Sequence, residues 1–234
     1  MILNKNALSL KKRLGRCFMI KAVIMDIDGT LLDSMPIWED LGKRYLASLG
    51  IQANVHLNTI LFPMSFDEAT HYLKEHYHLR QTEKVIKAGL INELEAFYLH
   101  QVQLKSGAKD FLELISQYHI PIIMATTGHL QLIKKALERL HVCHYFQKAY
   151  ACASKRTADI YLNIAHDLHL NNQDILVVED TYIAIRSAKN ASFLVAHIYD
   201  EASWKDNNAI KAIVDFDARN FYELINQLKE GNIL

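Results

Sequence analysis

The chain has 234 residues, half of them hydrophobic, with 26 basic and 26 acidic side chains that give no net charge at pH 7. This length and hydrophobicity suit one large domain or a core with an inserted module, and they exclude an intrinsically disordered chain. The basic residues are enriched before residue 25, so the rest of the chain is mildly acidic, which argues against a nucleic-acid-binding surface.

The start of the chain and its cysteines bear on localisation. Residues 1–18 lack the long apolar segment of a signal peptide and are too short and too charged to cross a membrane. We expect them to be an N-terminal extension without fixed structure or, equally, a segment upstream of the true translation start, because Met19 lies just before the first predicted strand. The three cysteines form no CxxC pair, which indicates a reducing, cytoplasmic setting.

The first predicted strand is the apolar run Ala22–Met25, which leads directly into Asp26 and Asp28. A short, continuous apolar run is typical of a strand buried on both faces of a parallel sheet. Ligands bind at the carboxyl edge of such sheets, and two carboxylates followed by Gly29 can share a hard cation there. An Asx turn explains the same residues equally well, whereas an EF-hand loop would need further oxygen ligands that the sequence lacks.

The next 70 or so residues are predicted to be helical. Apolar residues recur at helical spacing after Ser34 until Gly50, and the segments 66–77 and 83–103 are rich in helix formers. No alternating β pattern interrupts them. We therefore expect residues 34–103 to be a helical insertion between the first strand and the next strand-helix unit.

The β/α alternation then resumes. A helix is predicted from Gly107 to His119 and a strand over 120–125, which ends at Thr126 and Thr127 before a helix over 130–140. A hydroxyl at a strand end, next to the free N–H groups of a helix start, can hold a phosphate oxygen, although threonine is also an ordinary N-cap.

Two further strands carry polar residues at their ends. The strand over 148–153 is followed by Lys155, and the strand that begins at Ile175 ends in Glu179 and Asp180. Adjacent acids at a buried edge repel one another unless a positive charge lies between them. Closing strands are expected over 193–198 and 212–216, and a final helix over 221–228.

In this order the motifs resemble those of the haloacid dehalogenase superfamily, over nearly the whole chain from Met19 onward. The resemblance rests on Asp26-Ile27-Asp28-Gly29-Thr30, Thr126, Lys155 before Asp159-Ile160-Tyr161, and Glu179-Asp180. Because the second aspartate, Asp28, is present, the chain is more similar to the magnesium-dependent phosphatases and phosphomutases of the family than to its dehalogenases.

The resemblance implies an α/β fold, a Rossmann-like doubly wound parallel sheet formed by residues 19–33 and 104–234, with residues 34–103 as a helical cap. It also implies phosphoryl transfer through an aspartyl phosphate, with Asp26 as nucleophile and Asp28 as general acid and base. The remaining implied sites are phosphate binding by Thr126, Thr127 and Lys155, and Mg²⁺ binding by Asp26, Asp28, Glu179 and Asp180.

Some positions depart from the family pattern. Arg156 and Ala158 replace the two prolines around the motif lysine, and Ala184 and Ser192 replace glycines after the second acid pair. These changes affect loop shape and packing and leave the acids in place. Without the two prolines, the loop that carries Lys155 is expected to be less rigid than in the family pattern. Lys155 is identified from its place before Asp159-Ile160-Tyr161.

The residues of the predicted cap favour hydrolysis over isomerisation. Mutases of this family carry a histidine where this chain has Trp38, and an arginine where Phe66 follows Ser65. We therefore expect a monomeric phosphatase for a small phosphorylated metabolite, with Trp38, Met64 and Ser65 as candidate substrate contacts. The alternatives are a β-phosphoglucomutase-type enzyme, a non-catalytic binding protein, or a phosphonoacetaldehyde hydrolase, which would need a cap lysine such as Lys43.

Overall fold

The computed structural model describes residues 19–61 and 64–234. The predicted N-terminal extension, residues 1–18, lies outside the described residues. The chain divides into two compact units, which are described separately. The sheet unit comprises the described residues up to Asp33 together with Gln103–Leu234, and the helical unit comprises Ser34–Val102.

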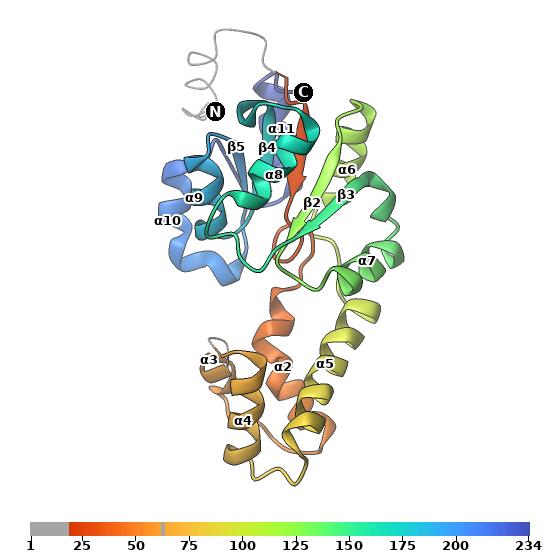
Figure 1. The fold of residues 1–234 in the computed structure, drawn as a ribbon, viewed down its shortest axis with the longest axis vertical. Helices are drawn as coiled ribbons and strands as arrows, with labels where there is room; N and C mark the ends of the chain where they lie inside the picture. The colour runs from red at the N-terminus through yellow and green to blue at the C-terminus, as the bar shows by residue number, and fades with distance from the viewer. Residues whose placement is uncertain (1–18, 62–63) are drawn as a thin grey trace. The chain divides into compact units, whose positions relative to one another are not determined.

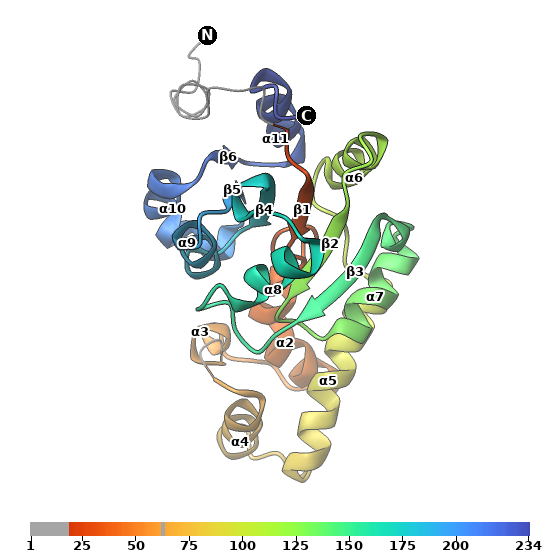
Figure 2. The ribbon, with the colours of Figure 1, turned by 45° about the horizontal axis from the view of Figure 1, so that its top comes forward.

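The sheet unit contains a parallel six-stranded sheet with the strand order β3-β2-β1-β4-β5-β6 (Figure 2). The chain enters at the centre of the sheet, builds outward on one side and then returns to build the other side. The predicted doubly wound α/β fold is therefore confirmed. The strands are β1 (Ala22–Met25), β2 (Ile122–Thr126), β3 (Phe146–Ala151), β4 (Ile175–Glu179), β5 (Leu194–Ile198) and β6 (Phe216–Ala218).

Helices cover both faces of this sheet, which explains why its central strands are apolar throughout. Every residue of β1, β2, β4 and β5 is buried. Alternate strand side chains pack against α8 (Asp159–Leu168), α9 (Tyr182–Asn190) and α10 (Asn207–Ile213). On the other face, α6 (Ala108–Gln117) and α11 (Phe221–Glu230) pack on each other through Phe111 and Phe221. The remaining helix of this unit is α7 (Leu130–Arg139).

The last predicted strand, over 212–216, was wrong in its position. Ala212 belongs to α10, and β6 begins only at Phe216. The buried residue Ile210 anchors α10 on the sheet, and Asp215 donates its backbone N–H to Val195 O at 3.0 Å to start the strand pairing. A short run of apolar residues that spans a helix end and a strand start has no single period.

The second and third strands also begin at other residues than predicted. Strand β2 starts at Ile122, because Ile120 donates its N–H to Ile115 O and so still belongs to the end of the preceding helix. Strand β3 covers Phe146–Ala151, two residues earlier than predicted, and Cys152 continues the pairing by donating its N–H to Thr126 O.

The helical unit consists of four helices, drawn in orange and yellow in Figure 1, within its described residues. They are α2 (Met35–Ser48), α3 (Leu57–Leu61), α4 (Phe66–His76) and α5 (Glu83–His100). Helices α2 and α5 pack closely because Gly89 lies against the ring of Tyr45, which leaves no room there for a side chain. Helix α4 begins at a capping box formed by Ser65 and Glu68.

The boundary of the helical unit differs by one residue from the predicted cap, residues 34–103. Gln103 belongs to the sheet unit, where its carbonyl accepts a hydrogen bond from Asp33 N at 3.0 Å. Leu104 forms a bridge with Leu32 in the same pair of connecting segments.

Across residues 19–61 and 64–234, we find no helix with both the length and the apolar character that a membrane span requires.

Candidate active site

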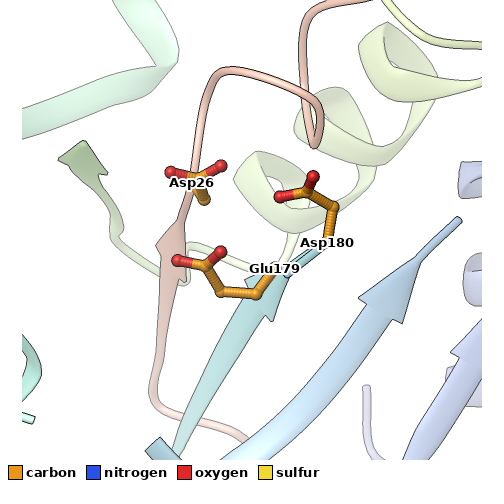
Figure 3. Close-up of side chains that lie close together, drawn as sticks. All are labelled: Asp26, Glu179 and Asp180. Atoms are coloured by element: carbon orange, nitrogen blue, oxygen red, sulfur yellow. The ribbon is translucent and has the colours of Figure 1, made fainter. Parts of the chain in front are cut away.

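Three buried acids meet at the carboxyl ends of the two central strands (Figure 3). Asp26 directly follows β1, while Glu179 is the last residue of β4 and Asp180 follows it. Strands β1 and β4 are neighbours in parallel register, with Met25 opposite Val178, so their ends coincide. Carboxylate oxygens of the three acids lie within 4.8 Å of one another. Oxygen atoms in this arrangement can hold a hard divalent cation.

Lys155 lies buried between two of these acids. Its Nζ contacts Asp26 Oδ1, donates to Glu179 Oε1 at 2.5 Å, and donates to Ala125 O at 2.8 Å. The loop after β3 therefore delivers a positive charge to the acids even though Arg156 and Ala158 replace the two prolines of the family pattern. Burial opposes the charge on this lysine, but the two carboxylates outweigh it and raise the pKa of Lys155 above its usual value.

One lysine does not neutralise the acids. Burial, together with the neighbouring Asp26 carboxylate, raises the pKa of Glu179 to about 7, although Lys155 acts in the opposite direction. Burial, Asp26 and Glu179 also raise the pKa of Asp180 well above its usual range. The cluster thus carries more negative charge than its protein partners stabilise, which is the condition that a bound cation relieves. The donor set fits a hard divalent metal ion.

Tyr161 is a member of the site that we did not predict. Its hydroxyl donates to Glu179 Oε1 at 2.8 Å, and the side chain is completely buried in α8. Burial and the Glu179 carboxylate raise the pKa of Tyr161, so the hydroxyl keeps its proton and remains a donor. Within the described residues, Oε1 of Glu179 therefore accepts from both Lys155 and Tyr161. Tyr161 was part of the predicted motif Asp159-Ile160-Tyr161, but no role had been assigned to it, because its apolar spacing in the helix is also typical of an ordinary core tyrosine.

The loop after β1 brings Thr30 to the other side of the cluster. Gly29 adopts a left-handed conformation with φ of 80°, and the N–H groups of Leu31 and Leu32 both donate to Ile27 O. This tight turn places Thr30 Oγ1 at 3.1 Å from Asp180 Oδ1, to which it donates. Thr30 was part of the predicted motif, but no role had been assigned to it.

Asp28 lies against the loop that follows β2. A Cβ atom at Gly128 would be 2.4 Å from Asp28 Oδ2 and 3.2 Å from Thr126 Oγ1, so only glycine leaves room for the carboxylate there. The buried hydroxyl of Thr126 accepts a hydrogen bond from Gly128 N at 2.8 Å, and Thr127 is exposed. The structure thus brings together two sequence-distant parts of the predicted site, the Asp28 loop and the Thr126 loop.

The three predicted substrate contacts belong to the helical unit. Trp38 is half-buried on α2 and its ring packs edge-on against Phe66, with centroids 6.4 Å apart. Ser65 Oγ accepts from Glu68 N at 3.3 Å as the N-cap of α4, and Met64 precedes it. The serine hydroxyl therefore has a local structural partner that accounts for its presence.

Fold and site together define a class of protein: an open parallel α/β protein with a buried acidic centre, bridged by a lysine, at the carboxyl edge of its sheet. The family model for haloacid dehalogenase-like hydrolases matches residues 23–198. The chain belongs to this family, which confirms the predicted resemblance and the prediction that the protein is a hydrolase.

Individual relatives agree with this family. The chain is 23% identical to a phosphorylated carbohydrates phosphatase from Thermotoga maritima, over 90% of this chain and 99% of the relative. It is similar in fold to a crystal structure from Thermotoga maritima named as a beta-phosphoglucomutase candidate, with a TM-score of 0.78, 21% identity, and coverage of 90% and 99%. A HAD family hydrolase from Deinococcus radiodurans with bound phosphate and sodium has a TM-score of 0.74 at 17% identity, with coverage of 92% and 97%.

Proposed function

We propose that the protein is a magnesium-dependent phosphatase that hydrolyses the phosphate monoester of a small metabolite, a sugar phosphate or a similar compound. The observation that carries this proposal is the buried cluster of Asp26, Glu179 and Asp180 with Lys155 between two of its members. The activity in the name of the Thermotoga maritima phosphatase supports the same substrate class.

In the proposed reaction, a carboxylate oxygen of Asp26 attacks phosphorus in line with the leaving group. The P–O bond to the alcohol breaks, and Asp28 gives the departing oxygen a proton. Asp28 then takes a proton from water, whose oxygen attacks the aspartyl phosphate and restores Asp26 with release of inorganic phosphate. This order of steps needs Asp26 ionised and Asp28 protonated at the start.

The other polar groups would bind charge in this reaction. Thr126, Thr127 and Lys155 would hold the phosphoryl oxygens, and the Lys155 ammonium would offset the charge of nucleophile and phosphate together. Asp26, Asp28, Glu179 and Asp180 would hold Mg²⁺, which when bound supplies positive charge to the phosphoryl oxygens. Tyr161 and Thr30 would keep Glu179 and Asp180 in their orientations through the hydrogen bonds described above.

The helical unit is proposed to act as the cap that selects the substrate and excludes water. Trp38, Met64 and Ser65 are the side chains we propose for contact with the substrate. We further propose that the enzyme works as a cytoplasmic monomer; the free thiols of the two described cysteines, Cys143 and Cys152, support a reducing setting.

The test is phosphate release from a panel of phosphorylated sugars, nucleotides and small metabolites, with and without Mg²⁺. Magnesium-dependent release that Asp26→Asn abolishes is the expected result. Asp174→Asn is the matched control, because Asp174 precedes the other end of β4, where it pairs with Lys21 at 2.8 Å. Release that persists in Asp26→Asn, or that needs no divalent cation, would contradict the proposal.

A phosphomutase is the second candidate, since the Thermotoga maritima structure that resembles this fold carries a mutase name. Trp38 and Phe66 replace the histidine and arginine on which mutases of the family depend, which favours hydrolysis. An assay for isomerisation of a sugar phosphate in the presence of a bisphosphate activator, monitored by phosphorus NMR, distinguishes a phosphomutase from a phosphatase. If neither reaction occurs and Mg²⁺ does not raise the thermal stability, a non-catalytic binding role replaces both.

A further inference from the structure

A second buried ion pair lies in the sheet unit, beside the acid cluster and outside the machinery described so far. Lys105 Nζ is 2.7 Å from Asp200 Oδ2, and their side chains are only 11% and 6% exposed. The same ammonium donates to Tyr199 O at 2.8 Å. Asp200 follows strand β5, so its carboxylate stands at the same edge of the sheet as Asp180, which follows the neighbouring strand β4.

The backbone of Lys105 is also joined to the loop that carries Thr30. Its N–H donates to Leu31 O at 2.9 Å, and the preceding residue, Leu104, bridges to Leu32. Leu31 follows Thr30, whose hydroxyl donates to Asp180 Oδ1. Lys105 therefore contacts the end of β5 through its side chain and the Asp28–Leu32 turn through its backbone.

The register of the strands places the pair next to the acid cluster. Glu179, the last residue of β4, is opposite His197 of β5, and Asp200 comes three residues after His197. Because both side chains are buried, solvent screens their charges little, and the two charges act on a cation at the acid cluster with opposite signs.

We propose that Lys105 and Asp200 are positioning residues that set the affinity of the acid cluster for its divalent cation. This inference rests on the proposed function, because it assumes that the cluster binds Mg²⁺. The lysine repels the incoming cation and keeps the Asp28–Leu32 turn in place, while the aspartate limits that repulsion. A buried ion pair with a purely structural role would affect stability alone.

The test is the dissociation constant of Mg²⁺, measured by isothermal titration calorimetry on metal-free protein, together with the Mg²⁺-induced rise in melting temperature. Lys105→Met leaves the negative charge of Asp200 uncompensated, so we expect Mg²⁺ to bind about fivefold more tightly. Asp200→Asn leaves the positive charge of Lys105 uncompensated, so we expect binding to weaken by about the same factor. The double variant is expected to lie between them, and Lys105→Arg close to wild type.

The matched control is Lys189→Met, since Lys189 pairs with Asp215 at 2.6 Å and this half-buried pair is attached to Val195, near the start of β5. This variant should lose stability without a change in Mg²⁺ affinity. If Lys105→Met fails to fold, the Mg²⁺ affinities of Asp200→Asn and of the double variant are compared with that of the wild type instead. Asp200→Asn is nearly isosteric with the wild type.

The outcomes separate the two proposals. The role of the pair is overturned if the wild-type protein binds Mg²⁺ and releases phosphate, but the variants of the pair leave the Mg²⁺ affinity unchanged or shift it in the same direction. The proposed function then still stands. Wild-type protein that neither binds Mg²⁺ nor releases phosphate overturns the proposed function, and this inference with it.

Discussion

Glu179 shows how much of this site depends on individual hydrogen bonds. One of its carboxylate oxygens receives the Lys155 ammonium and the Tyr161 hydroxyl, at 2.5 and 2.8 Å. An acid that is fully buried beside Asp26 would otherwise be protonated or would turn away. The orientation of the carboxylate is therefore fixed by Lys155 and by Tyr161, a residue of α8 that belongs to the hydrophobic core.

Replacement of Tyr161 by phenylalanine tests this point. Tyr161→Phe keeps the ring in the core but removes the donor, so we expect a loss of about 2 kcal/mol in the free energy of unfolding. We also expect about a tenfold lower kcat with little change in KM. Tyr150→Phe is the control, because Tyr150 OH also donates to a carboxylate, that of Asp167, at the surface. Equal effects of the two variants on kcat would contradict a role for Tyr161 in the site.

At the scale of elements, the loop between β2 and α7 has to leave space for Asp28. In Gly128→Ala, the new methyl group would meet the Asp28 carboxylate, which is the movable end of its side chain. We expect the side chain to rotate away, so the melting temperature should change little while kcat falls by about tenfold to a hundredfold. A variant that keeps its activity, or one that loses activity only because it unfolds, would contradict this reading of the loop.

Elements with a single local pattern could be predicted from the sequence. Strands β1 and β4 are continuous apolar runs that end in acids, and both were predicted together with the residues of the acid cluster. The segment 212–216 could not be placed, because its apolar residues belong partly to α10 and partly to β6. Its strand begins only where Asp215 pairs with Val195, a contact from another strand.

Residues whose roles depend on distant partners also escaped prediction. The hydroxyl of Thr30 donates a hydrogen bond to Asp180, which lies 150 positions further along the chain. Lys105 forms an ion pair with Asp200, and neither residue belongs to a predicted motif. Spacing along the chain carries no information about such pairs, whereas the carboxyl edge of a parallel sheet brings all of them together.

For the whole molecule, the acid cluster makes stability depend on pH when no metal is bound. The folded state raises the pKa of Glu179 from 4.5 to about 7, so between these values it binds more protons than the unfolded chain does. Stability therefore falls as the pH rises through this range, by up to about 3 kcal/mol. Asp180, whose pKa is also raised, contributes with the same sign.

Denaturant unfolding at pH 5, 6, 7 and 8 in the presence of EDTA measures this loss. Glu179→Gln is the control, since it cannot ionise and should show a smaller decrease. Added Mg²⁺ should raise the stability most at pH 7 and 8, where the acids are ionised and can bind it. A metal-free protein whose stability relative to Glu179→Gln increases from pH 5 to 7 would contradict the assignment.

The division of the sheet unit into two chain segments also has a consequence for biosynthesis. Strand β1 lies at the centre of the sheet, yet both of its neighbours, β2 and β4, follow the helical unit in the sequence. On the ribosome, the helical unit is complete before β1 has any strand with which to pair. Asp26 is among the first residues of the site to emerge and Asp180 the last, so a translation product truncated before β4 contains the proposed nucleophile but no complete acid cluster.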